Sequence, residues 1–219
     1  MEAVSKLYRK IDSIDNDSIK LALYNLILDY SRSHGIMPYI AKSMYQRYLI
    51  ERNDFSRLKE TYQNGKYILH YADFLSSEER ASLYYKLGIH AYTLSNHNEC
   101  IAYCKEVLKV GGHYKADALG VLIDAYFSIG AYTESELYLL QYKNFAYPNI
   151  KENVVLMDAF YAAKKEVSTK PSNSLHHFLR YVAMRPLFRR QNNFFNCTYR
   201  RKTLKGLKLF WRTTRQLPL

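Results

Sequence analysis

The sequence predicts an all-α protein, a right-handed solenoid of antiparallel helix pairs, and an internal repeat is the main reason. Between Ala81 and Phe145, a shift of 35 residues brings Leu87 onto Leu122 and Tyr103 onto Tyr138. Each copy holds two apolar stripes of helical spacing, separated by a short polar break. Such a period is typical of a helical solenoid, because one helix pair cannot bury both of its apolar faces alone.

The residues of the repeat also fit the tetratricopeptide pattern. That pattern has a large aromatic residue, a leucine, a glycine, a small residue, a second packing residue and a final apolar pair. The first copy has residues of these types in the same order: Tyr84, Leu87, Gly88, Cys100, Cys104, Val107 and Leu108. Gly88 is expected to let two helices approach closely, with Cys100 as the small residue on the facing helix. The second copy has Ile123 where the first has the glycine.

Four helices are expected before the repeat, at about residues 4–11, 19–30, 38–49 and 55–72. The first break holds cap-type residues, Ser13 to Asp17, and the second holds Gly35, which can adopt the left-handed conformation. Pro38 suits the first turn of a helix. The segment from Met37 to Ala72 is interpreted as a weaker third copy of the repeat.

The repeat itself is expected to begin at an N-cap. Ser76 or Ser77 is followed by Glu78 and Glu79, and acidic side chains are favourable at the positive end of a helix. After the repeat, a break around Pro148 precedes one more predicted helix at about 154–163. No segment has the pattern of a strand.

Composition indicates a protein without a membrane span. The chain has 219 residues, of which 48% are apolar, and no apolar run approaches the length that crosses a bilayer. The N-terminal residues do not resemble a secretory signal. Three cysteines, an odd number, favour a reducing compartment. The expected location is the cytoplasm.

The formal net charge of +12 is carried by one end of the chain. All 20 Asp and Glu residues lie at or before Glu166. The Lys and Arg residues beyond that point number twelve: Lys170, Arg180, Arg185, Arg189, Arg190, Arg200, Arg201, Lys202, Lys205, Lys208, Arg212 and Arg215. Residues 1–166 are therefore neutral overall. The predicted organisation is a helical-repeat domain at 1–166 and a basic, aromatic-rich tail at 167–219.

The helical-repeat region resembles the tetratricopeptide regions of bacterial peptide-pheromone receptors. The resemblance is carried by the pair around Tyr45–Tyr62 and by the segments 87–92 and 125–130, and it covers roughly residues 5–166. The arbitrium receptors (AimR-like) of Bacillus phages are the most similar, and the Rgg, PlcR and Rap proteins are relatives. The resemblance implies a cytoplasmic receptor that binds a short linear peptide in a concave groove. No helix-turn-helix segment precedes the first pair, so the chain is expected to be a truncated member or to act through another protein.

In such a groove the ligand-facing positions lie on the first helix of each pair. The candidate peptide-binding residues are Arg47, Tyr85, Tyr92, Asp117 and Asp124. Asp124 stands within an apolar run, where burial of an unpaired carboxylate is costly, so a basic residue of a peptide is one expected partner. An alternative is that Asp124 has a partner within the fold or is simply exposed.

The sequence contains little that indicates catalysis or metal binding. It has no phosphate-binding loop, no nucleophile elbow and no HExxH motif, so an enzyme is not predicted and no cofactor is expected. Cys100 and Cys104 are one helical turn apart, but they occupy packing positions of the repeat, where buried cysteine is common. They are interpreted as core residues.

The tail has three competing interpretations. Basic residues interleaved with aromatic ones are typical of single-stranded nucleic-acid binding, with Arg189, Arg190, Arg200, Arg201 and Lys202 as the candidate contacts. The segment 202–215 is equally compatible with a basic amphipathic helix at an anionic membrane. An acid-free tail joined to a balanced domain is also what an out-of-frame extension would produce.

The sequence therefore predicts an intracellular peptide-sensing regulatory protein that binds a short linear peptide. The alternatives are a tetratricopeptide adaptor that binds a protein partner, and nucleic-acid binding through the tail. The identity of the ligand and the oligomeric state, a homodimer included, are left open by the sequence.

Overall fold

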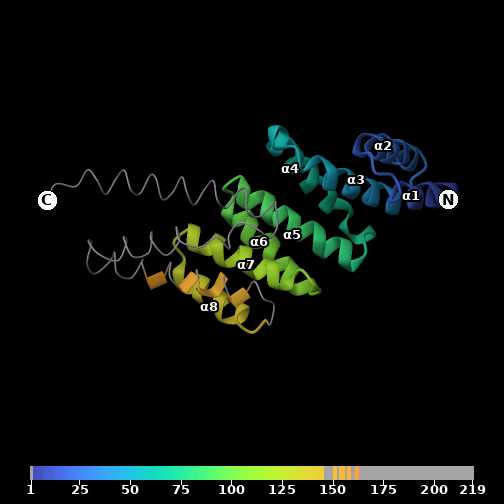
Figure 1. Ribbon diagram of the computed structural model, residues 1–219. Coiled ribbons are helices and arrows are strands. Elements are labelled where there is room, and N and C mark those ends of the chain that lie inside the picture. The colour runs from blue at the N-terminus through green and yellow to red at the C-terminus, as the bar shows by residue number, and fades with distance from the viewer. Residues whose placement is uncertain (1, 146–149, 152, 156, 159–160, 163–219) are drawn as a thin grey trace. The chain divides into compact units, whose positions relative to one another are not determined.

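The computed structural model describes residues 2–145, 150–151, 153–155, 157–158 and 161–162, and these residues are helical apart from the turns that join the helices. Two compact units are present, Met1–Ile150 and Lys151–Leu219. The all-α prediction is confirmed for the described part of the chain (Figure 1). None of the described helices is long and apolar enough to cross a membrane. In the second unit, the described residues between 151 and 162 are helical; they overlap the helix predicted at about 154–163 and begin a few residues before it.

The first unit begins with the helices α1 (Glu2–Ile11), α2 (Asp17–Ser33) and α3 (Met37–Glu51). The Asn16 side chain caps α2 by accepting a hydrogen bond from the backbone N–H of Ile19. Gly35 has a φ of +66° in the turn before α3, and a proline stands in the first turn of that helix. The predicted starts and breaks in this region are confirmed, because each depends on a local cap or turn residue.

The predicted helix at 55–72 is divided into three pieces. It consists of η1 (Phe55–Arg57), α4 (Leu58–Tyr67) and η2 (Ile68–Phe74), of which η1 and η2 are 3₁₀-helices. Apolar side chains counted at α-helical spacing cannot reveal such a change, because a 3₁₀-helix has three residues per turn. The expectation of one continuous helix was wrong here.

The predicted repeat forms α5 (Ser77–Thr93), α6 (His97–Val110), α7 (Lys115–Ser128) and α8 (Tyr132–Tyr142). The 35-residue period reappears in the backbone of the turns. The N–H of Asn96 donates to the carbonyl of Ala91, and the N–H of Ala131 donates to the carbonyl of Tyr126. Residues with positive φ stand at the same place in both turns, Ser95 and Gly130. The two copies therefore share their turn geometry, as the sequence shift predicts.

The helices of the first unit pack in an order that repeats. Each of α5, α6 and α7 packs against the next helix in the chain, and α5 also packs directly on α7 (Figure 1). Helix α4 packs on α3 and α5, and the Tyr62 hydroxyl and the Lys66 ammonium of α4 reach Glu99 on α6, at 2.5 Å and 2.6 Å. Thus α5 and α7, the first helices of their pairs, lie side by side, and side chains of the second helices α4 and α6 also contact each other.

Small residues allow the closest approaches in this core. A Cβ atom at Gly88 would lie 3.0 Å from the sulfur of Cys104, so α5 and α6 meet at the expected glycine. Cys100 and Cys104 are fully buried, which agrees with their interpretation as core residues. A Cβ atom at Gly65 would lie only 2.6 Å from the ring of Tyr48. These contacts hold α3, α4, α5 and α6 in one core.

Candidate functional site

Four of the five predicted peptide-binding residues lie along the contact between α5 and α7. Tyr85 and Tyr92 are seven residues apart on α5, and Asp117 and Asp124 are seven residues apart on α7. Asp117 lies close enough to the Tyr85 hydroxyl to affect its ionisation, and Asp124 does the same to Tyr92. Seven residues are about two helical turns, or roughly 10 Å along the axis. The structure therefore holds two successive Tyr–Asp pairs in register.

These tyrosines are held by ring contacts. Tyr85 stacks on Tyr114 with 5.0 Å between ring centroids, and Tyr92 meets His97 edge-on at 5.2 Å. The hydroxyl of Tyr92 lies 3.4 Å from that of Ser128. Burial raises the pKa of both Tyr85 and Tyr92, and the nearby carboxylates add to the effect. Both hydroxyls are therefore neutral at physiological pH and can act as hydrogen-bond donors toward an acceptor.

The two carboxylates differ in their surroundings. Asp117 is exposed to solvent. The protein atoms around it nevertheless raise the pKa of its carboxyl by desolvation, and His113 opposes this effect. Asp124 is partly buried and engages in interactions within the fold, and its carbonyl accepts a hydrogen bond from Ser128 Oγ at 2.7 Å. The carboxylate of Asp124 also affects the ionisation of Tyr92. A ligand cation would add to those contacts.

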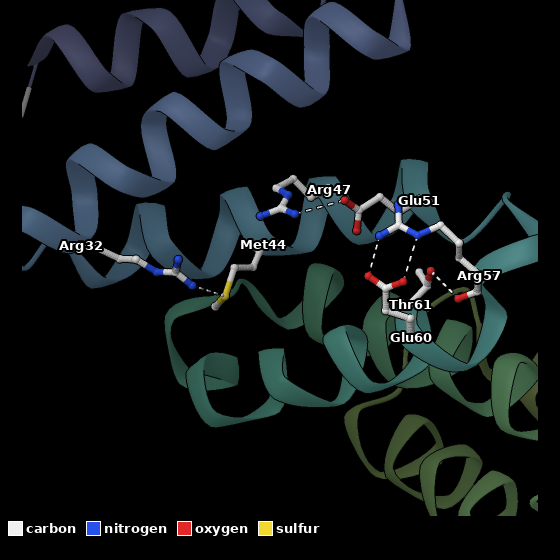
Figure 2. A network of polar contacts seen from close by, with 7 residues as sticks. All are labelled: Arg32, Met44, Arg47, Glu51, Arg57, Glu60 and Thr61. Atoms are coloured by element: carbon white, nitrogen blue, oxygen red, sulfur yellow. Dashed lines mark hydrogen bonds and ion pairs between the residues drawn. The ribbon is translucent and has the colours of Figure 1, made fainter.

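Arg47, the fifth predicted residue, belongs to a different set of contacts. Its guanidinium pairs with Glu51 at 3.1 Å, one turn further along α3. Figure 2 shows this pair next to Arg57 and Glu60, which form a second ion pair, so the four charges alternate in sign. In the same view, Arg32 of α2 reaches the sulfur of Met44, and the hydroxyl of Thr61 donates to the carbonyl of Arg57. The positive charge of Arg47 is thus paired with the carboxylate of Glu51 on the same helix.

The α3 residues Tyr45 and Tyr48 face α5, and Arg52, which caps the C-terminal end of α3, lies near Tyr48. Tyr48 bonds to His90 of α5 at 3.2 Å, and Tyr45 is a partner of Ser82. Burial raises the pKa of Tyr45 to about 12, and the positive charge of Arg52 opposes this shift. At about 100° per residue, position 47 is well removed from this row. Arg52, the residue that follows α3, is a cation close enough to Tyr85 to affect its ionisation.

Two further residues join the site without having been predicted, Lys86 and Tyr114. The Lys86 ammonium donates to Ser82 Oγ at 2.5 Å and to the Tyr114 hydroxyl at 3.4 Å. It also lies over the Tyr114 ring, 5.0 Å from the centroid. Lys86 follows the predicted residue Tyr85 directly and is one helical turn from Ser82, so helical spacing could have placed Lys86 beside Ser82. Tyr114 lies in the turn before α7, and its contacts could not be read from periodicity.

Within the described residues, no group of three or more His, Cys, Asp or Glu side chains could hold a metal ion. Burial and the neighbouring Cys100 raise the pKa of the Cys104 thiol. The candidate nucleic-acid contacts Arg189, Arg190, Arg200, Arg201 and Lys202 lie outside the described residues.

Comparisons of the chain with protein families, with curated proteins and with solved structures find no match in any of the three. The functional argument therefore depends on the geometry of the site.

Proposed function

We propose that this protein is a tetratricopeptide-like solenoid whose α5–α7 face binds a short linear peptide carrying a basic residue. The observation that carries the proposal is that α5 and α7 pack together and bring Asp117 close enough to Tyr85, and Asp124 close enough to Tyr92, to affect the ionisation of each tyrosine, at the same seven-residue spacing on both helices. Each pair offers a carboxylate for a peptide cation and a ring for an aliphatic or aromatic side chain.

The size of this face suits a short ligand. The two pairs are separated by roughly 10 Å along the helices. An extended peptide spans about 3.3–3.6 Å per residue, so about three residues bridge the pairs. The rings are already held by Tyr114, His97 and Ser128, which reduces the side-chain entropy lost on binding. A face prepared in this way favours a short peptide as the ligand.

The biological role that we infer is an intracellular peptide-sensing regulator, similar to the arbitrium-type receptors that the sequence resembles. The shared turn geometry of the two repeat copies and the packing of α5 on α7 support this class. The rival role is an adaptor that binds a folded protein partner through the same face.

The test uses two pools of random hexapeptides, one with arginine fixed at a central position and one with glutamate fixed there. We expect the arginine pool to raise the melting temperature of the full chain, and the glutamate pool to leave it unchanged. A peptide isolated from the first pool stabilises the fold by ~2.7 kcal/mol when present at 100 times its dissociation constant. Fluorescence anisotropy of that peptide, labelled, gives the affinity.

Matched variants locate the site. Asp124→Asn should weaken binding of the isolated peptide at least tenfold, whereas Arg47→Met, on another row of α3, should leave the affinity unchanged. Equal binding of the two pools, or full affinity in Asp124→Asn, would reject the proposed function. Binding of a folded partner that neither pool displaces would favour the adaptor.

A further inference from the structure

Lys86 of α5 is a partly buried lysine whose hydrogen-bond partners are both hydroxyls. Its Nζ atom donates to Ser82 Oγ at 2.5 Å and to the Tyr114 hydroxyl at 3.4 Å. Across the residues that the structure describes, none of the ion pairs includes Lys86. Lys66, in contrast, is paired with the carboxylate of Glu99 at 2.6 Å. No carboxylate therefore fixes the proton on Lys86 as Glu99 does on Lys66.

The surroundings of the Lys86 amine form a fixed cluster. The hydroxyl of Ser82 donates to that of Tyr114 at 3.2 Å, so the amine and the two hydroxyls all contact one another. Lys86 Nζ also lies 5.0 Å from the centroid of the Tyr114 ring, which stacks on Tyr85 at 5.0 Å. Because hydroxyls can donate or accept, these contacts suit a neutral amine as well as an ammonium.

The same surroundings affect how readily Lys86 loses its proton. Burial lowers the pKa of its ammonium, and Tyr114 opposes this effect only in part. Lys105, by contrast, is exposed on α6, with its Nζ atom 5.6 Å from the centroid of the Tyr126 ring, and that tyrosine raises its pKa. A lysine reacts as a nucleophile through its neutral form, which desolvation favours. Lys86 is therefore the better nucleophile of the two.

We propose that Lys86, held by the hydroxyls of Ser82 and Tyr114, binds a small aldehyde covalently and reversibly as an imine. The lysine nitrogen attacks the carbonyl carbon, a C–N bond forms, and one nitrogen proton passes to the carbonyl oxygen. The second nitrogen proton then joins that oxygen, which leaves as water while the C=N bond forms. An amine and an aldehyde thus give an imine and water, and no oxidant or reductant is consumed.

An aldehyde is the class of ligand that this site suits. Lysine is the side chain that forms imines with carbonyl compounds, and a partly desolvated lysine does so most readily. Ser82 is buried, whereas Lys86 and Tyr114 keep some exposure to solvent, so the cluster lies at the surface and suits a small molecule. The inference is independent of the proposed peptide binding, because none of the reacting groups belongs to the Tyr–Asp pairs.

The first experiment measures the reactivity of each lysine in the full chain. The protein is incubated with acetaldehyde, which has no charge for the basic tail to attract, and sodium cyanoborohydride converts imines to stable ethyl-lysines. Mass spectrometry of peptides then gives the rate at each position. We expect Lys86 to be labelled at least tenfold faster than Lys105, although Lys105 is the more exposed, and the two rates to become equal in urea. A Lys86 rate no higher than that of Lys105, or an advantage that persists in urea, would overturn the proposal.

A matched pair of variants tests the cause of the reactivity. Ser82→Asp places a carboxylate beside the amine and should slow labelling of Lys86 at least tenfold. Ser82→Asn has nearly the same size without the charge and should keep most of the rate, and Lys105 in each sample serves as the internal reference. Melting temperatures show that both variants are folded. Equal rates at Lys86 in the two variants would reject the role of the missing carboxylate. Adding the reductant only after the aldehyde has been removed should give no label, and label at Lys86 under that condition would contradict reversible binding.

Discussion

Gly65 of α4 is the residue at which a side chain is least tolerable. An added Cβ would lie 2.6 Å from one Tyr48 ring carbon and 2.9 Å from Leu87 Cδ2. Both neighbours are fully buried and cannot move aside without disturbing α3 and α5. Gly120 is also within a helix, but its nearest neighbour is the Tyr142 hydroxyl at 3.7 Å, an ordinary contact.

We therefore expect Gly65→Ala and Gly120→Ala to have opposite effects on stability. Gly65→Ala should lower the free energy of unfolding by about 1–3 kcal/mol through overpacking. Gly120→Ala should raise it by up to ~1 kcal/mol, because alanine favours the helix. Urea denaturation of the two variants measures both values. Equal changes in the two would mean that α4 does not rest on Tyr48 as described.

His90 connects three helices through an imidazole whose protonation is determined by its partners. Nε2 lies 2.8 Å from the carbonyl of Leu58 on α4, and a carbonyl only accepts, so Nε2 carries the proton. Nδ1 then accepts from the Tyr48 hydroxyl of α3 at 3.2 Å. Both ring nitrogens are thus satisfied in the neutral form, and burial lowers the pKa of His90 from 6.5 to about 4.

This shift predicts a loss of stability in acid. The folded protein resists protonation of His90 and the unfolded chain does not, so stability is complete above pH 6.5 and falls as the pH decreases toward about 4. The loss should approach about 3 kcal/mol. Denaturation midpoints between pH 7 and pH 4 measure it. His90→Phe should flatten the profile in this window, and the exposed control His34→Gln should keep it; an unchanged profile in His90→Phe would contradict the assignment.

At the scale of the element, the start of α5 is determined by a reciprocal cap. Ser76 Oγ accepts from the backbone N–H of Glu79 at 3.2 Å, and the Glu79 carboxylate accepts from the backbone N–H of Ser76 at 2.8 Å. Ser76→Ala should therefore cost about 1 kcal/mol and Ser76→Gly only a few tenths. Ser77→Ala, one residue away, should change stability by less than about 0.5 kcal/mol. Chemical denaturation measures the free energy of unfolding of each variant. Similar losses for Ser76→Ala and Ser77→Ala would contradict the assignment of Ser76 as the N-cap.

Most of the helix boundaries in the first unit could be predicted from the sequence, because they depend on local residues. Asn16, Gly35, Ser76 and Gly130 each cap a helix or make a turn through their own chemistry. The division of 55–72 into α4 and two 3₁₀-helices could not be predicted, since it depends on how this segment packs against α3 and α5.

The repeat accounts for how the proposed residues are arranged on α5 and α7, and it does not extend to α3. Helices α5 and α7 end at Thr93 and Ser128, one repeat apart, so the 35-residue shift relates each position on α5 to an equivalent position on α7. Helix α3 ends at Glu51, a longer step from Thr93, because the seven residues of η2 are inserted before α5. Carrying the same shift back to α3 therefore selected Arg47, whereas Arg52 is the cation beside Tyr85.

At the scale of the whole molecule, the charge is distributed in a way that suggests two separate tasks. The neutral part, residues 1–166, contains the Tyr–Asp pairs, and the tail carries the entire excess of +12. A peptide with a basic residue would be recognised by local carboxylates, since residues 1–166 carry no net charge to attract it. The tail, in contrast, attracts any polyanion at long range, and this attraction weakens with added salt.

The last prediction distinguishes an evolved nucleic-acid site in the tail from a chance accumulation of cations. Engaging six of the twelve tail cations on a single strand gives a slope of about −4 in a log–log plot of affinity against salt. Charge alone produces this slope, so the slope cannot decide. Stacking can, because it contributes ~1–3 kcal/mol per base and requires correctly placed rings. If the tail is an evolved site, replacing Phe194, Phe195 and Trp211 with leucine should weaken binding of a labelled oligonucleotide at least tenfold at fixed salt. Unchanged affinity, with the same salt slope, would reject a nucleic-acid site, because only non-specific charge attraction would remain.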